Sequence, residues 1–180
     1  MTDIFNMIII ALWVILPAYM ANAGAVPFGG GTPIDFGKSA ADGNRYFGDG
    51  KTWRGLIGGI LVGFIGGCIQ IWLSKQYNWN WLPEHTYITV FLLSSGALIG
   101  DLTKSYIKRR FNKDRGVKWP IADIYDMIIG SLVLLTIFAW SWTFENINIW
   151  ILLIILILTP IIHRSANIIG YYMKLKQVPW

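Results

Sequence analysis

Cysteine, histidine and charge are all scarce in this chain of 180 residues. The single cysteine, Cys68, excludes an internal disulfide and a metal site built from several thiolates. The two histidines, His85 and His163, lie outside the charged loops, and we assign neither a role. Charged residues make up 14% of the chain, against ~25% in an average soluble domain, and 54% are hydrophobic. This composition excludes a water-soluble globule and indicates a membrane protein.

The apolar residues form five runs, each a candidate for one of the ~20-residue helices that cross a bilayer. The expected spans are 4–26, 56–73, 87–104, 121–144 and 147–163. The third run is apolar only as far as Gly100, but it can continue as a helix past Asp101. We therefore expect an all-α polytopic membrane protein, a single domain formed by a bundle of five transmembrane helices with two functional cytoplasmic loops.

Basic residues set the expected orientation, because the cytoplasmic loops of membrane proteins carry an excess of Lys and Arg. Every Lys and Arg except Lys75 lies in residues 27–55, in residues 101–126 or after residue 163. Five spans put these segments on one side. We expect an integral cell membrane protein with its N-terminus outside and loops 27–55 and 105–120 and tail 164–180 in the cytoplasm. A cleaved signal peptide is disfavoured, because no Lys or Arg precedes the first apolar run.

The first charged loop, residues 27–55, is rich in glycine and has neither helical nor strand periodicity. Glycines expose backbone N–H groups to anions. Lys51 and Arg54 stand three residues apart, and we expect them on one face of the first turn of the next helix, whose dipole also favours an anion. We favour phosphate binding over a loop that rests on anionic lipid headgroups, because three interleaved aspartates would weaken such an anchor.

Small and polar residues inside the first two runs predict close helix packing. Asn22 follows Pro17, which is expected to kink the first helix. Its amide either closes a hydrogen bond between helices or contacts a ligand, and the sequence does not decide between the two. Glycines recur at every fourth position of the second helix, a pattern that lets another helix approach closely: Gly55, Gly59, Gly63 and Gly67.

Acidic and basic side chains share one face where the third helix continues beyond its apolar run. The spacing i, i+3, i+4, i+7 brings together Asp101, Lys104, Ser105 and Lys108. A carboxylate can hold Mg²⁺ while the cations neutralise phosphate oxygens. This face therefore predicts a combined site for a metal and a phosphate.

A second acidic pair, Asp123 and Asp126, begins the fourth helix after Pro120. Compensation of the helix dipole would account for Asp123. It would not account for Asp126, which adjoins an apolar run where a charge at full membrane depth costs ~2.5–3.5 kcal/mol. We favour a pair of ligands for a divalent metal over a salt bridge to a cation, and both interpretations remain open.

The motifs in both loops resemble those of the phosphatidate cytidylyltransferases. In the second loop the resemblance rests on Ser105-Tyr-Ile-Lys108-Arg109, Lys113-Asp114, Pro120 and Asp123-Ile-Tyr-Asp126. The first loop is more similar to the archaeal branch of that family, the CDP-archaeol synthases, in Gly29-Gly-Gly-Thr-Pro33-Ile-Asp35-Phe-Gly-Lys38, Asp42-Gly-Asn-Arg45 and Gly48-Asp49-Gly50-Lys51-Thr52-Trp53-Arg54-Gly55. The resemblance covers most of residues 17–130. A His-Gly-Gly run typical of the bacterial branch is missing.

The resemblance implies that an unsaturated archaeal ether-lipid phosphate, 2,3-di-O-geranylgeranylglyceryl phosphate, attacks CTP to give CDP-archaeol and pyrophosphate, with Mg²⁺ as cofactor. The metal would then be held by Asp101, Asp123 and Asp126. The triphosphate and the nucleotide pocket would involve Lys51, Arg54, Lys104, Lys108, Asn22, Gly48, Asp49, Thr52 and Ser105. The lipid phosphate at the headgroup plane would meet Arg109 and Arg110.

Two other activities are consistent with the composition. One is a CDP-diacylglycerol synthase acting on phosphatidate, and the other is a small membrane transporter. Transporters carry charges near the bilayer midplane and often show inverted repeats. Here the charges gather at one face, which favours the enzyme. Nucleic acid is not an expected partner, because both basic loops are short and tied to spans at each end.

Overall fold

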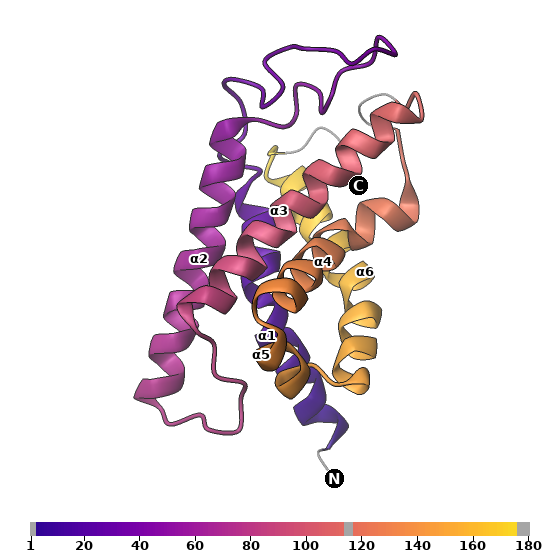
Figure 1. Ribbon diagram of the computed structural model, residues 1–180. Coiled ribbons are helices and arrows are strands. Elements are labelled where there is room, and N and C mark those ends of the chain that lie inside the picture. Colours follow the sequence, from indigo (N-terminus) through magenta and orange to yellow (C-terminus); the bar gives the residue numbers. More distant parts are fainter. Residues whose placement is uncertain (1–2, 114–116, 176–180) are drawn as a thin grey trace.

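The computed structural model describes residues 3–113 and 117–175, and its regular secondary structure there is helical. The helices are α1 (Ile4–Gly24), α2 (Trp53–Gln76), α3 (Tyr87–Arg110), α4 (Pro120–Phe138), α5 (Trp140–Asn146) and α6 (Ile149–Tyr172) (Figure 1). Four of them, α1, α2, α4 and α6, are long and apolar enough to cross a membrane. The prediction of an all-helical polytopic membrane protein is therefore confirmed.

Helix α3 packs against α1, α2 and α4 and is the most enclosed helix of the bundle. Two of its buried serines form hydrogen bonds within the helix: Ser94 donates to the carbonyl oxygen of Val90 at 2.8 Å, and Ser95 to that of Phe91 at 2.6 Å. A helix that faces other helices needs no uniformly apolar surface. This explains why α3 is less apolar than the four helices that hydropathy identifies as spans.

The glycine face of α2 packs as its spacing predicts. A Cβ atom added to Gly59 would lie 2.7 Å from the carbonyl oxygen of Ala21 in α1, and one added to Gly63 would lie 2.5 Å from that of Pro17. Any side chain at either position would push the two helices apart. The same face also meets α3, because a Cβ at Gly67 would overlap Val90.

Three helix boundaries differ from those expected. The predicted span 121–144 is wrong, because α4 ends at Phe138, where Ala139 leaves the helical region and a separate short helix, α5, begins. Helix α3 runs to Arg110, so its charged face is helical as predicted and the connector to α4 is shorter than residues 105–120. Helix α6 continues to Tyr172, well into the expected tail 164–180.

Candidate active site

The two hydrophilic connectors meet at one end of the bundle. The long loop between α1 and α2 lies over the C-terminal end of α3 (Figure 1). Arg110 at the end of α3 pairs with Asp42 of this loop at 2.9 Å, and its guanidinium also donates to the carbonyl oxygens of Asn44 and Arg45. Asn44 donates in turn to Asn112, which follows α3, at 2.7 Å. The loop is therefore fastened to the helix that carries the predicted site.

A buried carboxylate, Asp35, organises this loop from within. It accepts hydrogen bonds from the guanidinium of Arg45, at 2.5 and 3.2 Å, and from the backbone N–H groups of Gly37, Phe47 and Gly48. Burial alone would raise the pKa of Asp35, but these hydrogen bonds outweigh burial and hold that pKa well below its ordinary range. The carboxylate stays charged, and the loop keeps one shape around it.

Gly48 sits where the loop touches α3. Its φ of +91° is one that L side chains rarely adopt. An added Cβ would also lie 2.8 Å from a guanidinium nitrogen of Arg109, which hydrogen bonds to the carbonyl oxygens of Phe47 and Lys113. The backbone angle requires glycine at this position, whereas the flexible end of Arg109 could move away from an added side chain.

The centre of the site is the ammonium group of Lys104. Its Nζ atom lies 3.2 Å from Asp101 on the same helix, and 3.1 Å from Asp123 and 2.9 Å from Asp126 on α4. Asp123 also contacts Lys108 at 3.5 Å and accepts the backbone N–H of Trp119 at 2.7 Å. The acidic residue predicted on the third helix and the acidic pair predicted at the start of the fourth thus meet at one ammonium group.

Close backbone contact between α3 and α4 creates this convergence. A Cβ at Gly100 would lie 2.1 Å from the carbonyl oxygen of Asp126, and one at Gly130 would lie 2.2 Å from that of Gly96. Glycines at these three positions let the helix backbones touch directly. Asp126 and Asp101 can therefore reach the same ammonium group.

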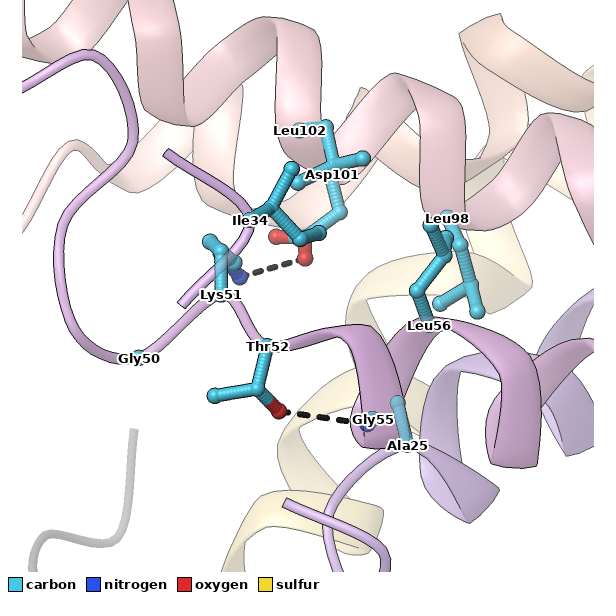
Figure 2. Close-up of a pocket in the computed structure, with 10 residues that line it drawn as sticks. All are labelled: Ala25, Ile34, Gly50, Lys51, Thr52, Gly55, Leu56, Leu98, Asp101 and Leu102. Carbon is cyan, nitrogen blue, oxygen red and sulfur yellow. Dashed lines mark hydrogen bonds and ion pairs between the residues drawn. The ribbon is translucent and has the colours of Figure 1, made fainter. Parts of the chain in front are cut away.

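Lys51 brings the first loop into the same cluster. Its ammonium pairs with Asp101, beside a small cavity of about 50 Å³ between the loop, α2 and α3 (Figure 2). Thr52 is the N-cap of α2, and its buried hydroxyl accepts the N–H of Gly55 at 3.2 Å. The hydroxyl thereby pairs one of the N–H groups that are free at the start of a helix, and that group is no longer available to an anion.

The prediction that Lys51 and Arg54 share one face of a helical turn is wrong. Lys51 precedes the N-cap and lies in the loop, so it turns toward Asp101. Arg54 is exposed and packs near Gly31, where an added Cβ would lie 3.0 Å from its side chain.

The other predicted site residues differ in their exposure. Ser105 is buried in α3, and Asn22 is half-buried near the end of α1. Asp49 is exposed and pairs with Arg45 at 2.7 Å. The predicted Lys113-Asp114 motif is described only as far as Lys113, because residue 114 lies outside the described ranges.

Sequence reasoning assigned no role to Asp35 or Arg45, although both belong to the motifs of the first loop. The available signal was chemical. Asp35 precedes an aromatic residue and a glycine and stands ten residues before Arg45. Neither an apolar core nor a helix accounts for a carboxylate at this place in the sequence. The structure makes this pair the internal framework of the loop.

The donor set of the cluster fits a hard divalent cation. Three carboxylates from two helices already surround one cationic group, and oxygen ligands are those that Mg²⁺ prefers. In residues 3–113 and 117–175, no three acidic, histidine or cysteine side chains form an open metal site as they stand. In this cluster the Lys104 ammonium lies among the carboxylates, so the salt-bridge interpretation of Asp123 and Asp126 describes their present contacts, and the metal interpretation stays a prediction.

The fold and the site define a class: a helical membrane protein with a charged site where its bundle meets two hydrophilic connectors. A solved structure described as "Structural insight into an intramembrane enzyme for archaeal membrane lipids biosynthesis" superposes with a TM-score of 0.73 at 30% identity, covering 89% of this chain and 94% of that one. The family model "CarS-like: CDP-archaeol synthase" matches residues 4–180.

Curated relatives agree with this match over nearly their whole length. The CDP-archaeol synthase of Methanocorpusculum labreanum is 55% identical, and that of Methanoculleus marisnigri is 50% identical. In each case the match covers 92% of this chain and 99% of the relative. The chain belongs to the CDP-archaeol synthase family, as the resemblance of its loop motifs predicted.

Proposed function

We propose that this protein transfers the cytidylyl group of CTP to 2,3-di-O-geranylgeranylglyceryl phosphate, giving CDP-archaeol and pyrophosphate. A phosphate oxygen of the lipid forms a bond to the α-phosphorus of CTP. The bond from that phosphorus to the bridging oxygen breaks, and pyrophosphate leaves with the electron pair. The observation that carries the proposal is the convergence of Asp101, Lys104, Lys108, Asp123 and Asp126 beside the first loop, in a chain of this family.

The charge of the site suits the physical problem of the reaction. Both substrates are anions, and catalysis of such transfers consists mainly of positioning and charge stabilisation. Lys51, Lys104 and Lys108 enter the cluster from the loop and from α3, so they can contact a triphosphate from two sides. The lipid phosphate is ionised at neutral pH and is itself the nucleophile, so the reaction needs no side-chain nucleophile.

Mg²⁺ is the cofactor we propose, held by Asp101, Asp123 and Asp126. When bound, it would neutralise the developing charge on phosphate oxygens.

Arg109 and Arg110 both hold the first loop through hydrogen bonds. Each guanidinium has five N–H donors, more than these bonds use, so a contact with the lipid phosphate does not require any of them to be exchanged.

We also propose that α3 is the fifth span, so that the N-terminus lies outside and the site faces the cytoplasm. Helix α2 is long and apolar enough to cross the membrane and starts from the first loop. The connector after α3 touches that same loop, as the 2.7 Å bond between Asn44 and Asn112 requires. A chain that leaves along α2 must return along α3 to make this contact.

A reconstituted assay tests the reaction. Purified protein in lipid, with radiolabelled CTP and the ether-lipid phosphate, is expected to form CDP-lipid with Mg²⁺ and none with EDTA. Asp123→Asn keeps the size of the side chain and an oxygen for the Trp119 N–H, but it removes a charge from the cluster. We expect turnover to fall at least about 100-fold, the scale of one lost electrostatic contact in a transition state.

Glu145→Gln is the matched control, because it removes a carboxylate from α5 instead of from the cluster. It should keep wild-type turnover. Full activity in Asp123→Asn would refute the role of that carboxylate. Phosphatidate in place of the ether lipid tests the alternative substrate, and faster turnover of phosphatidate would replace the ether-lipid proposal.

A further inference from the structure

The ammonium of Lys104 occupies the position between the carboxylates where a cation cofactor would be expected. Its contacts at 2.9, 3.1 and 3.2 Å reach three different aspartates on two helices. The side chain is only 16% exposed, so water screens these contacts poorly. Such a group competes directly with any metal that uses the same oxygen atoms.

The cluster as a whole is self-neutral. It contains three ammonium groups and three carboxylates, and every carboxylate touches at least one ammonium: Lys51, Lys104, Lys108, Asp101, Asp123 and Asp126. A divalent cation arriving alone meets carboxylates that are already paired. A triphosphate arriving alone meets ammonium groups whose charge is already compensated. Neither ligand finds a net charge that attracts it.

Both ligands together meet a different balance. A lysine carries a compact charge on a flexible stem of four carbons, so its ammonium can change partners without movement of the helix. If the triphosphate takes over the ammonium of Lys104, Asp126 loses its ammonium partner, and the three carboxylates then carry one more charge than the two remaining ammonium groups, which favours a metal. If a metal displaces that ammonium from the aspartates, the ammonium becomes free for phosphate. Each ligand therefore breaks the pairing between Lys104 and the aspartates that hinders binding of the other ligand.

We propose that Lys104 is a built-in counter-ion that couples the binding of CTP to the binding of Mg²⁺. This inference rests on the proposed function and adds to it a regulation of the same site. Each ligand binds weakly alone and strengthens the other by the same factor, as linkage requires. The enzyme thereby avoids holding a metal when no nucleotide is present, because its own lysine keeps the carboxylates together.

Calorimetric titration of the purified full chain tests the coupling without turnover. The nucleotide probe is a CTP analogue with a methylene bridge between the α- and β-phosphates, which cannot release pyrophosphate. The Kd of Mg²⁺ is measured with and without saturating analogue, and the Kd of the analogue with Mg²⁺ or with EDTA. For the wild type we expect each ligand to tighten the other at least about 10-fold, within the usual range of allosteric coupling.

Lys104→Met isolates the counter-ion. Without the ammonium, Mg²⁺ alone should bind at least about 10-fold more tightly than to the wild type, and the coupling factor should fall toward one. Lys104→Gln serves as a second neutral variant, because its amide can still donate to the carboxylates if the methionine variant does not fold. Lys75→Met is the control, because Lys75 is exposed in the last turn of α2 and is not a member of the cluster. It should leave most of the coupling intact.

The outcomes separate this inference from the proposed function. If neither Mg²⁺ nor the analogue binds under any combination, the proposed function fails. If both bind but independently in the wild type, or if neither neutral variant at position 104 changes the affinity for Mg²⁺ alone, the function stands and the counter-ion inference is overturned.

Discussion

At the scale of single residues, the loop between α1 and α2 depends on Asp35. Its carboxylate is buried, and it joins segments ten to thirteen residues apart by contacting Arg45, Phe47 and Gly48. A glycine-rich loop has high conformational entropy when unfolded. Several charge-assisted hydrogen bonds on one carboxylate offset part of that cost. The loop can then present Lys51 to α3 in a fixed position.

Asp35→Asn is expected to loosen the loop while the helices stay folded. The amide can still accept one backbone N–H, but its own N–H₂ group would face the guanidinium of Arg45, donor against donor. The lost hydrogen bonds to a charged partner are worth about 2–3 kcal/mol. Tryptic cleavage at the exposed Lys38, which follows the open population of the loop, should therefore accelerate at least about 10-fold.

Asp49→Asn provides the control for this experiment. It removes the other carboxylate that pairs with Arg45, but that carboxylate is 69% exposed, and exposed ion pairs contribute little. Its cleavage rate should stay near that of the wild type. Equal protection of Asp35→Asn and wild type would show that the carboxylate does not organise the loop.

The sequence predicted the charges of the site better than their partners. Asp101, Lys104 and Lys108 were placed on one face by helical spacing alone, and they lie on one face. The partner of Lys51 could not be predicted, because it depends on where the loop crosses α3, fifty residues away. The role of Asp35 was missed for the same reason, since only the folded loop buries it.

At the scale of helices, two prolines create hydrogen bonds between neighbours. A proline inside a helix leaves the carbonyl oxygen four residues earlier without its N–H donor. Pro17 in α1 frees the carbonyl of Trp13, which accepts from Gln70 of α2 at 2.9 Å and contacts the imidazole Nε2 of His85 at 3.2 Å. An unpaired carbonyl is costly inside a membrane, so the carbonyl that each proline frees accepts a hydrogen bond from a side chain of a neighbouring helix.

The second such bond joins α6 to the helix that carries the acidic pair. Pro160 frees the carbonyl of Leu156, and the hydroxyl of Tyr125 donates to it at 3.1 Å. Tyr125→Phe should therefore lower the stability of the protein in detergent by about 1–3 kcal/mol, the cost of an unpaired buried acceptor. In a Pro160→Ala background the backbone N–H of residue 160 can serve Leu156 instead. The same tyrosine substitution should then cost clearly less.

This double-mutant cycle is measured by thermal or denaturant unfolding in one detergent. An equal loss of stability in both backgrounds would show that Tyr125 contributes through packing alone. The pattern could not be recognised from sequence, because the prolines were visible but the donors lie 31 to 72 residues away along the chain.

Gly100 tests how closely α3 and α4 must approach. Gly100→Ala would place a methyl group 2.1 Å from the carbonyl oxygen of Asp126, so α4 must shift and carry Asp126 away from Lys104. We expect activity to fall at least about 100-fold, because small displacements of positioned groups have large kinetic costs. The control is Gly66→Ala in α2, whose methyl group would meet only the flexible end of Met20. That variant should keep most of its activity, and similar losses in both would contradict a specific role for the contact.

At the scale of the whole molecule, the starts of the long helices were predicted more accurately than their ends. Runs of apolar residues identify helices that face lipid, and α1, α2 and α6 begin within about three residues of their predicted positions. The fourth span was extended too far, because Trp140 to Phe144 continue the apolar run although the chain turns at Ala139. Hydropathy measures how favourably residues transfer from water to lipid. It does not detect a turn of the backbone at the end of the bundle.

The proposed number of crossings rests on a contact between connectors. The loop before α2 and the connector after α3 touch through Asn44 and Asn112, so both must lie on one side of the membrane. If α2 crosses, α3 must cross back, although α3 does not itself have the hydropathy of a span. With α1, α4 and α6 the proposed total is five, and the two termini are then expected on opposite sides. From the positive-inside rule we expect the connected loops to lie in the cytoplasm.

Single-cysteine labelling in intact cells tests this topology, and the chain is convenient because Cys68 is its one cysteine. In a Cys68→Ala background, Asn80→Cys lies in the exposed connector between α2 and α3 and should react with a membrane-impermeant maleimide. Lys38→Cys and Asn112→Cys are also exposed, but they should react only after the cells are permeabilised. Labelling of positions 38 and 112 from opposite sides would exclude α3 as a span. Labelling of both from outside would retain five crossings but reverse the orientation, and the site would then face away from cytoplasmic CTP.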